Sequence, residues 1–148
     1  MGSSDLMLKP GIHRKGKVNL LDALSYILKS NLSGEIGALL VFIGVARREG
    51  RGGKEVAKLE MESYEKHANK AILKICNEVK RKFKVHFVSI HHLVGQFRVG
   101  EPVVLVVVGG ARKENVFLAM QESVKRYKKE PALFKKELYV DNSYAWIQ

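Results

Sequence analysis

Hydrophobic residues recur along this chain with two kinds of spacing, and each spacing predicts one type of element. Segments in which apolar residues return every three to four positions predict amphipathic helices. These segments are residues 20–31, 65–83 and 111–127. Segments that are apolar throughout, or that alternate apolar and polar residues, predict strands. These segments are residues 36–45, 56–64, 85–93, 103–108, 138–140 and 144–147. Because helices and strands do not strictly alternate, we predict an α+β fold.

The ends of these elements carry their own signals. Asn19 is a good helix N-cap, and Pro131 stops the last helix because proline lacks a backbone donor. That helix presents one apolar face, formed by Val116, Phe117, Met120, Val124 and Tyr127. The continuous apolar run 36–45 predicts a strand that is buried on both faces. We expect one domain over residues 1–148, with residues 1–17 as a loose N-terminal segment because they show no periodicity.

Composition limits the classes of function. The chain has 148 residues, 46% of them hydrophobic, and a net charge of +11, which implies an acidic partner such as nucleic acid, a phosphorylated small molecule or an acidic protein surface. One cysteine, Cys76, excludes an internal disulfide. His91 and His92 are neighbours on a predicted strand and point to opposite faces, so no metal site is expected. No segment is long and apolar enough for a membrane span, and no secretory signal is seen, so we expect a cytoplasmic protein.

The strongest candidate chemistry lies in residues 125–136, where six basic residues stand against one acidic residue. Lys128 and Lys135 flank the proline corner at Pro131, so the chain can fold back and bring both ammonium groups together. Such a stretch is commonly a solvated basic face, but a lysine pair can also bind an anion or activate an acyl group. The glycine-rich basic loop 47–54 is likewise either a flexible connection or a mobile lid that carries an arginine.

Several segments together resemble one enzyme family. They are GALLVFIGVAR at 37–47, LEMESYEKHANKAI at 59–72, HHLVGQFRVGE at 91–101, ARKENVFLAM at 111–120, KKEPALFKKE at 128–137 and YAWI at 144–147. In this order and spacing, over about 110 residues, they are similar to the large, catalytic subunit of molybdopterin synthase.

The resemblance implies a fold and an activity. The fold is an α/β-hammerhead-like core with an additional antiparallel β subdomain. The activity is that of a sulfurtransferase, which converts cyclic pyranopterin monophosphate (precursor Z) to molybdopterin. The sulfur comes from a thiocarboxylated ubiquitin-like small subunit, and a homodimer of large subunits binds two small ones in a heterotetramer. No cofactor or metal of its own, no membrane and no nucleic acid is expected.

The resemblance also implies site residues. The catalytic lysine pair of the family matches Lys128 and Lys135. The substrate-binding positions match one segment that ends in arginine, one basic pair and one lysine–glutamate pair: Val45, Ala46 and Arg47; Arg112 and Lys113; Lys136 and Glu137. Where the family has a His–Arg pair, this chain has Arg112–Lys113, so a permanent cation replaces a titratable imidazole. Lys128 could act in acid–base catalysis or stabilise an oxyanion.

Two other functions are consistent with parts of the sequence. The charge alone would suit an RNA-binding α+β module, but there is no aromatic RNP signature and no GXXG loop, and aromatic residues make up only 8% of the chain. The missing histidine would suit a non-catalytic paralogue that still binds the ubiquitin-like partner. An assay of molybdopterin formation separates these alternatives.

Overall fold

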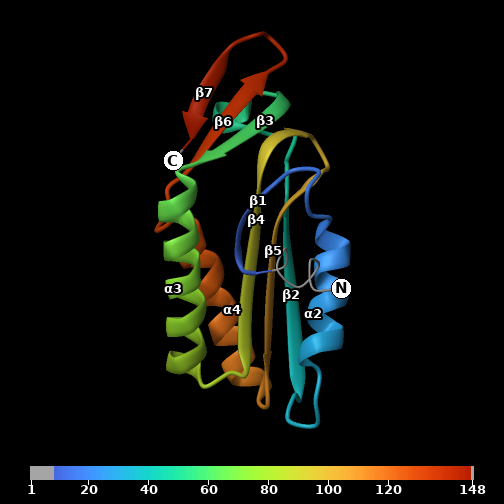
Figure 1. The fold of residues 1–148 in the computed structure, drawn as a ribbon. Helices are drawn as coiled ribbons and strands as arrows, with labels where there is room; N and C mark the ends of the chain where they lie inside the picture. The colour runs from blue at the N-terminus through green and yellow to red at the C-terminus, as the bar shows by residue number, and fades with distance from the viewer. Residues whose placement is uncertain (1–8, 148) are drawn as a thin grey trace.

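The computed structural model describes residues 9–147, which form an α+β fold (Figure 1). Its strands and helices follow in this order: β1 Gly11–Arg14, α2 Leu20–Asn31, β2 Ala38–Val45, the 3-10 turn η1 Arg51–Gly53, β3 Val56–Ser63, α3 Glu65–Phe83, β4 Phe87–Arg98, β5 Pro102–Gly110, α4 Lys113–Tyr127, β6 Leu133–Tyr139 and β7 Tyr144–Ile147. The predicted fold class is confirmed.

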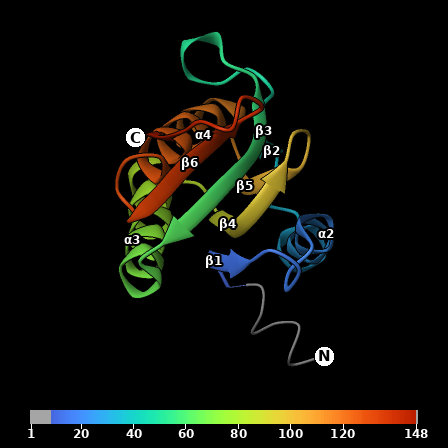
Figure 2. The same cartoon turned by 90° about the horizontal axis from the view of Figure 1, so that it is seen from above.

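The strands form one sheet in the order β2-β5-β4-β3-β6-β7, and β1 pairs in parallel with β4. In the core of the fold, α3 and α4 cover one face of β2, β5 and β4, and α2 covers the other face (Figure 1). Beyond this core, β3, β6 and β7 form a second antiparallel unit, which is joined to the core through residues 95–98 of β4 (Figure 2). This arrangement matches the expected hammerhead-like core with an additional antiparallel β subdomain.

Local sequence explains where the helices begin and end. The Asn19 side chain accepts hydrogen bonds from the backbone N–H groups of Leu21 and Asp22, so α2 begins at the predicted cap. α3 ends at Phe83, and the next residue, Lys84, takes the left-handed conformation (φ 55°) that commonly closes a helix. α4 ends at Tyr127, four residues before Pro131.

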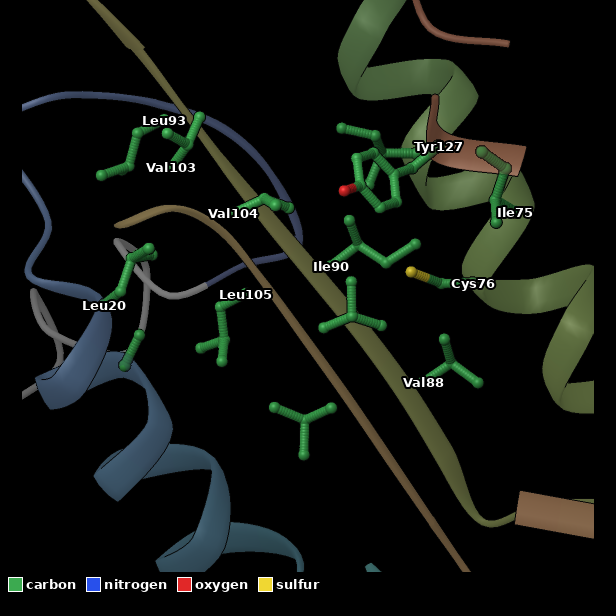
Figure 3. Close-up of a cluster of buried hydrophobic side chains, with 14 of the residues drawn as sticks. Leu20, Ile75, Cys76, Val88, Ile90, Leu93, Val103, Val104, Leu105 and Tyr127 are labelled. Carbon is green, nitrogen blue, oxygen red and sulfur yellow. The ribbon is translucent and has the colours of Figure 1, made fainter. Parts of the chain in front are cut away.

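The core lies on both faces of the sheet, against the helix pair α3 and α4 on one face and against α2 on the other (Figure 3). Ile75 and Cys76 of α3 pack toward Ile90 of β4, and all three side chains are buried. Burial raises the pKa of the Cys76 thiol to about 12, because the apolar surroundings disfavour the thiolate. Cys76 is therefore a small core residue, not a nucleophile.

Three local expectations were wrong. β2 is not buried on both faces: it lies at the sheet edge, and Val41, Ile43 and Val45 are each 38–52% exposed. Phe117 is not part of the buried face of α4 but is 57% exposed. Residues 11–14, expected within a loose segment, form β1, because pairing with β4 supplies backbone partners that no periodicity reveals.

Two further features of the described residues bear on membrane insertion and on metal binding. No helix between residues 9 and 147 has the length and apolar character needed to cross a membrane. Within the same range, no three or more His, Cys, Asp or Glu side chains lie close enough together to hold a metal ion.

Candidate functional site

A cavity of about 330 Å³ lies where the core meets the β3–β6–β7 unit. Most of its lining side chains are apolar, and the remainder are two lysines, one histidine and one tyrosine. The lining residues are Phe42, Gly44, Val45, Leu59, Met61, His92, Val103, Val104, Tyr127, Lys128, Leu133, Lys135 and Ile147. Six strands and the end of α4 contribute to it, so the complete fold is needed to form the cavity.

The structure brings Lys128 and Lys135 to this cavity from the two sides of the Pro131 corner. Lys128 is the C-cap residue directly after α4, and Lys135 lies on β6 opposite Met61 of β3. The carboxyl end of a helix carries partial negative charge, which favours an ammonium group there. Neither lysine forms an ion pair with any acidic residue in the described range. Both charges are therefore available to a bound anion.

His92 also lines the cavity, and sequence analysis did not assign it to the site. Its Nδ1 lies 2.9 Å from the carbonyl oxygen of Leu93, and the ring is only 4% exposed. Burial is the main cause that lowers the pKa of His92 to about 4; the bond to the Leu93 carbonyl opposes this shift, and the nearby charge of Lys135 adds to it. The ring is thus neutral near pH 7.

Tyr127 closes the cavity beside His92. The two rings meet edge to face, with centroids 5.8 Å apart, and the Phe42 ring lies tilted against Tyr127 with centroids 6.5 Å apart. Burial raises the pKa of Tyr127 to about 12, so its hydroxyl stays protonated at neutral pH.

The segment Val45–Arg47 leads from the cavity to its rim. Val45 lines the cavity, and Ala46 is buried and exchanges backbone hydrogen bonds with Gly100 and Glu101. Arg47 is exposed, and its Nε donates to the carbonyl of Glu49 at 3.1 Å. Its guanidinium therefore lies along its own loop at the cavity end of the sheet.

Lys136 and Glu137 do not line the cavity. Lys136 lies on the opposite face of β6, where its Nζ is 4.0 Å from Glu60 and 4.4 Å from the ring centre of Tyr144. The Glu137 carboxylate is buried and accepts hydrogen bonds from the backbone N–H of Arg51 at 3.0 Å and from the Tyr139 hydroxyl at 2.8 Å. It thereby fastens the basic loop 47–54 to β6.

Arg112 and Lys113 lie far from the cavity in the same chain. They stand at the start of α4, whereas Lys128 stands at its end. A helix of 15 residues is about 22 Å long. One copy of the chain therefore does not bring Arg112 and Lys113 together with the two cavity lysines.

Comparison with known proteins identifies the family. The family model described as "MoaE protein" matches residues 19–130, which is most of the chain. The chain belongs to the MoaE protein family. Its full length aligns with the molybdopterin synthase catalytic subunit of Pyrococcus abyssi at 30% identity, covering 94% of that protein. The bovine protein of the same name is 30% identical over 126 residues, which is 85% of this chain. The chain spans 65% of the length of that bovine relative.

Solved structures show the same fold. Molybdopterin synthase from Staphylococcus aureus superposes with a TM-score of 0.80 at 23% identity, covering 93% of this chain and 96% of that one. A complex of subunits 1 and 2 of molybdopterin-converting factor from Helicobacter pylori contains a chain that superposes with a TM-score of 0.74 at 19% identity, covering 93% of this chain and 89% of that one. The resemblance noted in the sequence is thus confirmed at the level of family and fold.

Proposed function

We propose that this protein catalyses the formation of molybdopterin by transferring sulfur from the thiocarboxylate of a ubiquitin-like small subunit to precursor Z. The cavity carries this proposal, because two lysines without acidic partners among the described residues reach a mostly apolar pocket. A thiocarboxylate and a phosphorylated pterin are both anions, and the net charge of +11 attracts both. The names of the bovine and Pyrococcus relatives support the same activity.

Lys128 and Lys135 are the proposed catalytic residues. Sulfur transfer to a carbon of the pterin creates an acyl–sulfur bond to the small subunit, and release of that subunit passes through a tetrahedral oxyanion. Ammonium groups that are fixed before the reaction stabilise such an oxyanion, and more strongly in an apolar cavity than in water. Val45, Ala46 and Arg47 form the proposed substrate rim. The contacts of Lys136 and Glu137 instead support structural roles in β6 and in the attachment of the loop 47–54.

The distance between Arg112 and the cavity supports a homodimer. The outer edge of β2 has no strand partner among residues 9–147, and it carries the exposed side chains Val41 and Ile43. Gly37, just before β2, bonds to Gly110, so the start of β2 lies near Arg112, while its end at Val45 reaches the cavity. A second copy placed antiparallel along β2 would thus bring its Arg112 and Lys113 toward the cavity of the first, where they would bind the phosphate.

Mixed dimers test this arrangement. At precursor Z concentrations well below KM, a copy with Lys128→Ala and a copy with Arg112→Ala are each expected to be weak alone. Together they form dimers in which one cavity has both an intact Lys128 and an intact Arg112. Half of the sites in each mixed dimer are complete. About a quarter of wild-type activity should therefore return if the copies pair at random, and about a half if all dimers are mixed. No gain on mixing would place Arg112 outside the site.

The proposed protein partner is the ubiquitin-like small subunit, in a heterotetramer with two copies of this chain. The Helicobacter structure supports this partner, because it is a complex of subunits 1 and 2 of molybdopterin-converting factor. The apolar cavity walls suit an extended chain terminus, and the lysines suit its terminal anion. We also propose that both proteins meet in the cytoplasm, which cell fractionation tests.

The decisive experiment is reconstitution with thiocarboxylated small subunit and precursor Z, followed by measurement of molybdopterin. Lys128→Ala should lower turnover by roughly 10²–10³-fold, the usual effect of removing one oxyanion donor, and Lys135→Ala should act in the same direction. Lys129→Ala is the matched control, because Lys129 follows Lys128 directly but does not line the cavity. Absence of molybdopterin with the wild-type protein, alongside normal binding of the small subunit, would favour a non-catalytic paralogue instead.

A further inference from the structure

The proposed reaction needs a group that accepts a proton, and the cavity offers few. Release of the small subunit from an acyl–sulfur bond consumes water, and the attacking water must lose a proton. Lys128 and Lys135 are cations with donors only, and the protonated hydroxyl of Tyr127 is a poor acceptor of a proton. The other lining side chains are apolar, apart from His92. Among the described residues that line the cavity, His92 is thus the one whose side chain offers a basic lone pair.

The hydrogen bond of His92 determines which nitrogen is free. The carbonyl of Leu93 can only accept, so the Nδ1 that faces it at 2.9 Å carries the hydrogen. In a neutral imidazole the other nitrogen, Nε2, then has a lone pair. Nε2 has no hydrogen-bond partner among residues 9–147. The bond to Leu93 also fixes the ring in place, as a catalytic base requires.

We propose, on the basis of the proposed function, that His92 is the base that activates water to release the small subunit from the sulfur of the pterin. Nε2 takes one proton from water while the water oxygen bonds to the acyl carbon. The carbon–sulfur bond then breaks, and the same proton passes from His92 to the departing sulfur. The products are the small subunit with a carboxylic acid, which ionises in solvent, and the pterin thiol. No oxidant or reductant is needed.

The charges that face His92 suit this role. Lys135 on β6 and Lys128 at the end of α4 share its cavity, and Tyr127 is the other titratable group in contact with the ring. The Lys135 charge disfavours a proton on His92. Bound anions offset the lysine charges, so they raise the affinity of Nε2 for a proton when substrate is present. Arg112 has no lone pair and cannot perform this step.

Single-turnover measurements of the acyl–sulfur conjugate test the proposal. His92→Asn keeps an N–H for the Leu93 carbonyl but has no basic nitrogen. We expect the conjugate of small subunit and pterin to form at the wild-type rate and to be released about 10²–10⁴-fold more slowly, as intact-mass analysis would show. Added imidazole should partly restore release in His92→Ala. His91→Asn is the control, because His91 is the adjacent buried residue on the opposite face of β4 and contacts Ser89 and His13 instead.

The results separate this inference from the proposed function. Release at the wild-type rate in His92→Asn would overturn the role of His92 and leave the sulfur transfer intact. No conjugate and no product with wild-type protein would overturn both. If the variants do not fold, the wild-type pH profile decides, over the pH range in which the protein is still folded: release should slow as the pH falls from 7 toward 4, and a constant rate over that range would refute the proposal.

Discussion

Two buried histidines on β4 should make the stability of this protein strongly dependent on pH. His91 is fully buried between Ser89 and His13, and His92 is nearly so. Burial lowers the pKa of His91 to about 3 and that of His92 to about 4, from an ordinary value of 6.5. In the unfolded chain both side chains regain the ordinary value. At pH values between the folded and the ordinary pKa, the unfolded chain binds protons that the folded chain does not, so the free energy of unfolding falls as the pH falls.

The size of the effect follows from the shifts. Between pH 7 and pH 5, each histidine removes about 2 kcal/mol from the free energy of unfolding, by proton linkage. Together they remove about 4 kcal/mol, which is a large part of the 5–15 kcal/mol that is usual for a domain. Burial also lowers the pKa of His13, which adds to the loss. The carboxylates of Glu101 and Asp141 have lowered pKa values, so their stabilising contributions are lost mainly below pH 5.

Urea unfolding at pH 7 and at pH 5 measures this difference. In the wild type it should be about 4 kcal/mol, and in His91→Gln about 2 kcal/mol. The lower stability of the variant itself cancels, because each protein is compared only with itself. His67→Gln, at an exposed position on α3, should keep the full difference. An equal pH dependence in wild type and His91→Gln would show that the pKa of His91 is not lowered in the folded state and would refute the reasoning.

Three other outcomes are expected. Glu137→Ala removes two hydrogen bonds to a buried carboxylate and should cost about 2–3 kcal/mol of stability. It should also expose the loop at Arg51 to cleavage by trypsin. Glu60→Ala, on the opposite sheet face, should leave the loop protected. Arg47→Ala should raise KM for precursor Z several-fold with unchanged binding of the small subunit, and unchanged kinetics would remove it from the site. Ile43→Lys should weaken the proposed homodimer in light scattering, since it places a charge on the exposed face of β2.

Local signals in the sequence predicted the helices well because each one acts over a few residues. Asn19 caps α2 through its own side chain, and Pro131 lies just after the end of α4, where it prevents the helix from continuing. β2 was harder to predict. Its apolar run has the composition of a central strand, yet the strand lies at the sheet edge with Val41 and Ile43 exposed. Composition does not distinguish a face that is covered by the same chain from a face that is left for another chain.

The candidate site was predictable only in part. The position of Lys128 and Lys135 on either side of a proline corner suggested that they could meet, and both line one cavity. Strand alternation also predicted that His91 and His92 point to opposite faces. Which of the two faces would contain a cavity depends on β6 and the end of α4, both more than 30 residues away in sequence. His92 therefore emerged only from the three-dimensional structure.

Arg112 stands where the family resemblance implies a histidine, and its proposed role follows from where charge and where proton transfer are needed. A site for two anions needs permanent cations at its rim, and arginine serves there because its guanidinium stays protonated and binds phosphate through a planar fork. Proton transfer instead needs a neutral imidazole that is shielded from solvent, and His92 lies in such an environment on the same chain as the two lysines. If Arg112 acts from a second copy, its loss should raise KM and leave kcat nearly unchanged. Loss of His92 should lower kcat with little effect on KM, so the two residues are separable by steady-state kinetics.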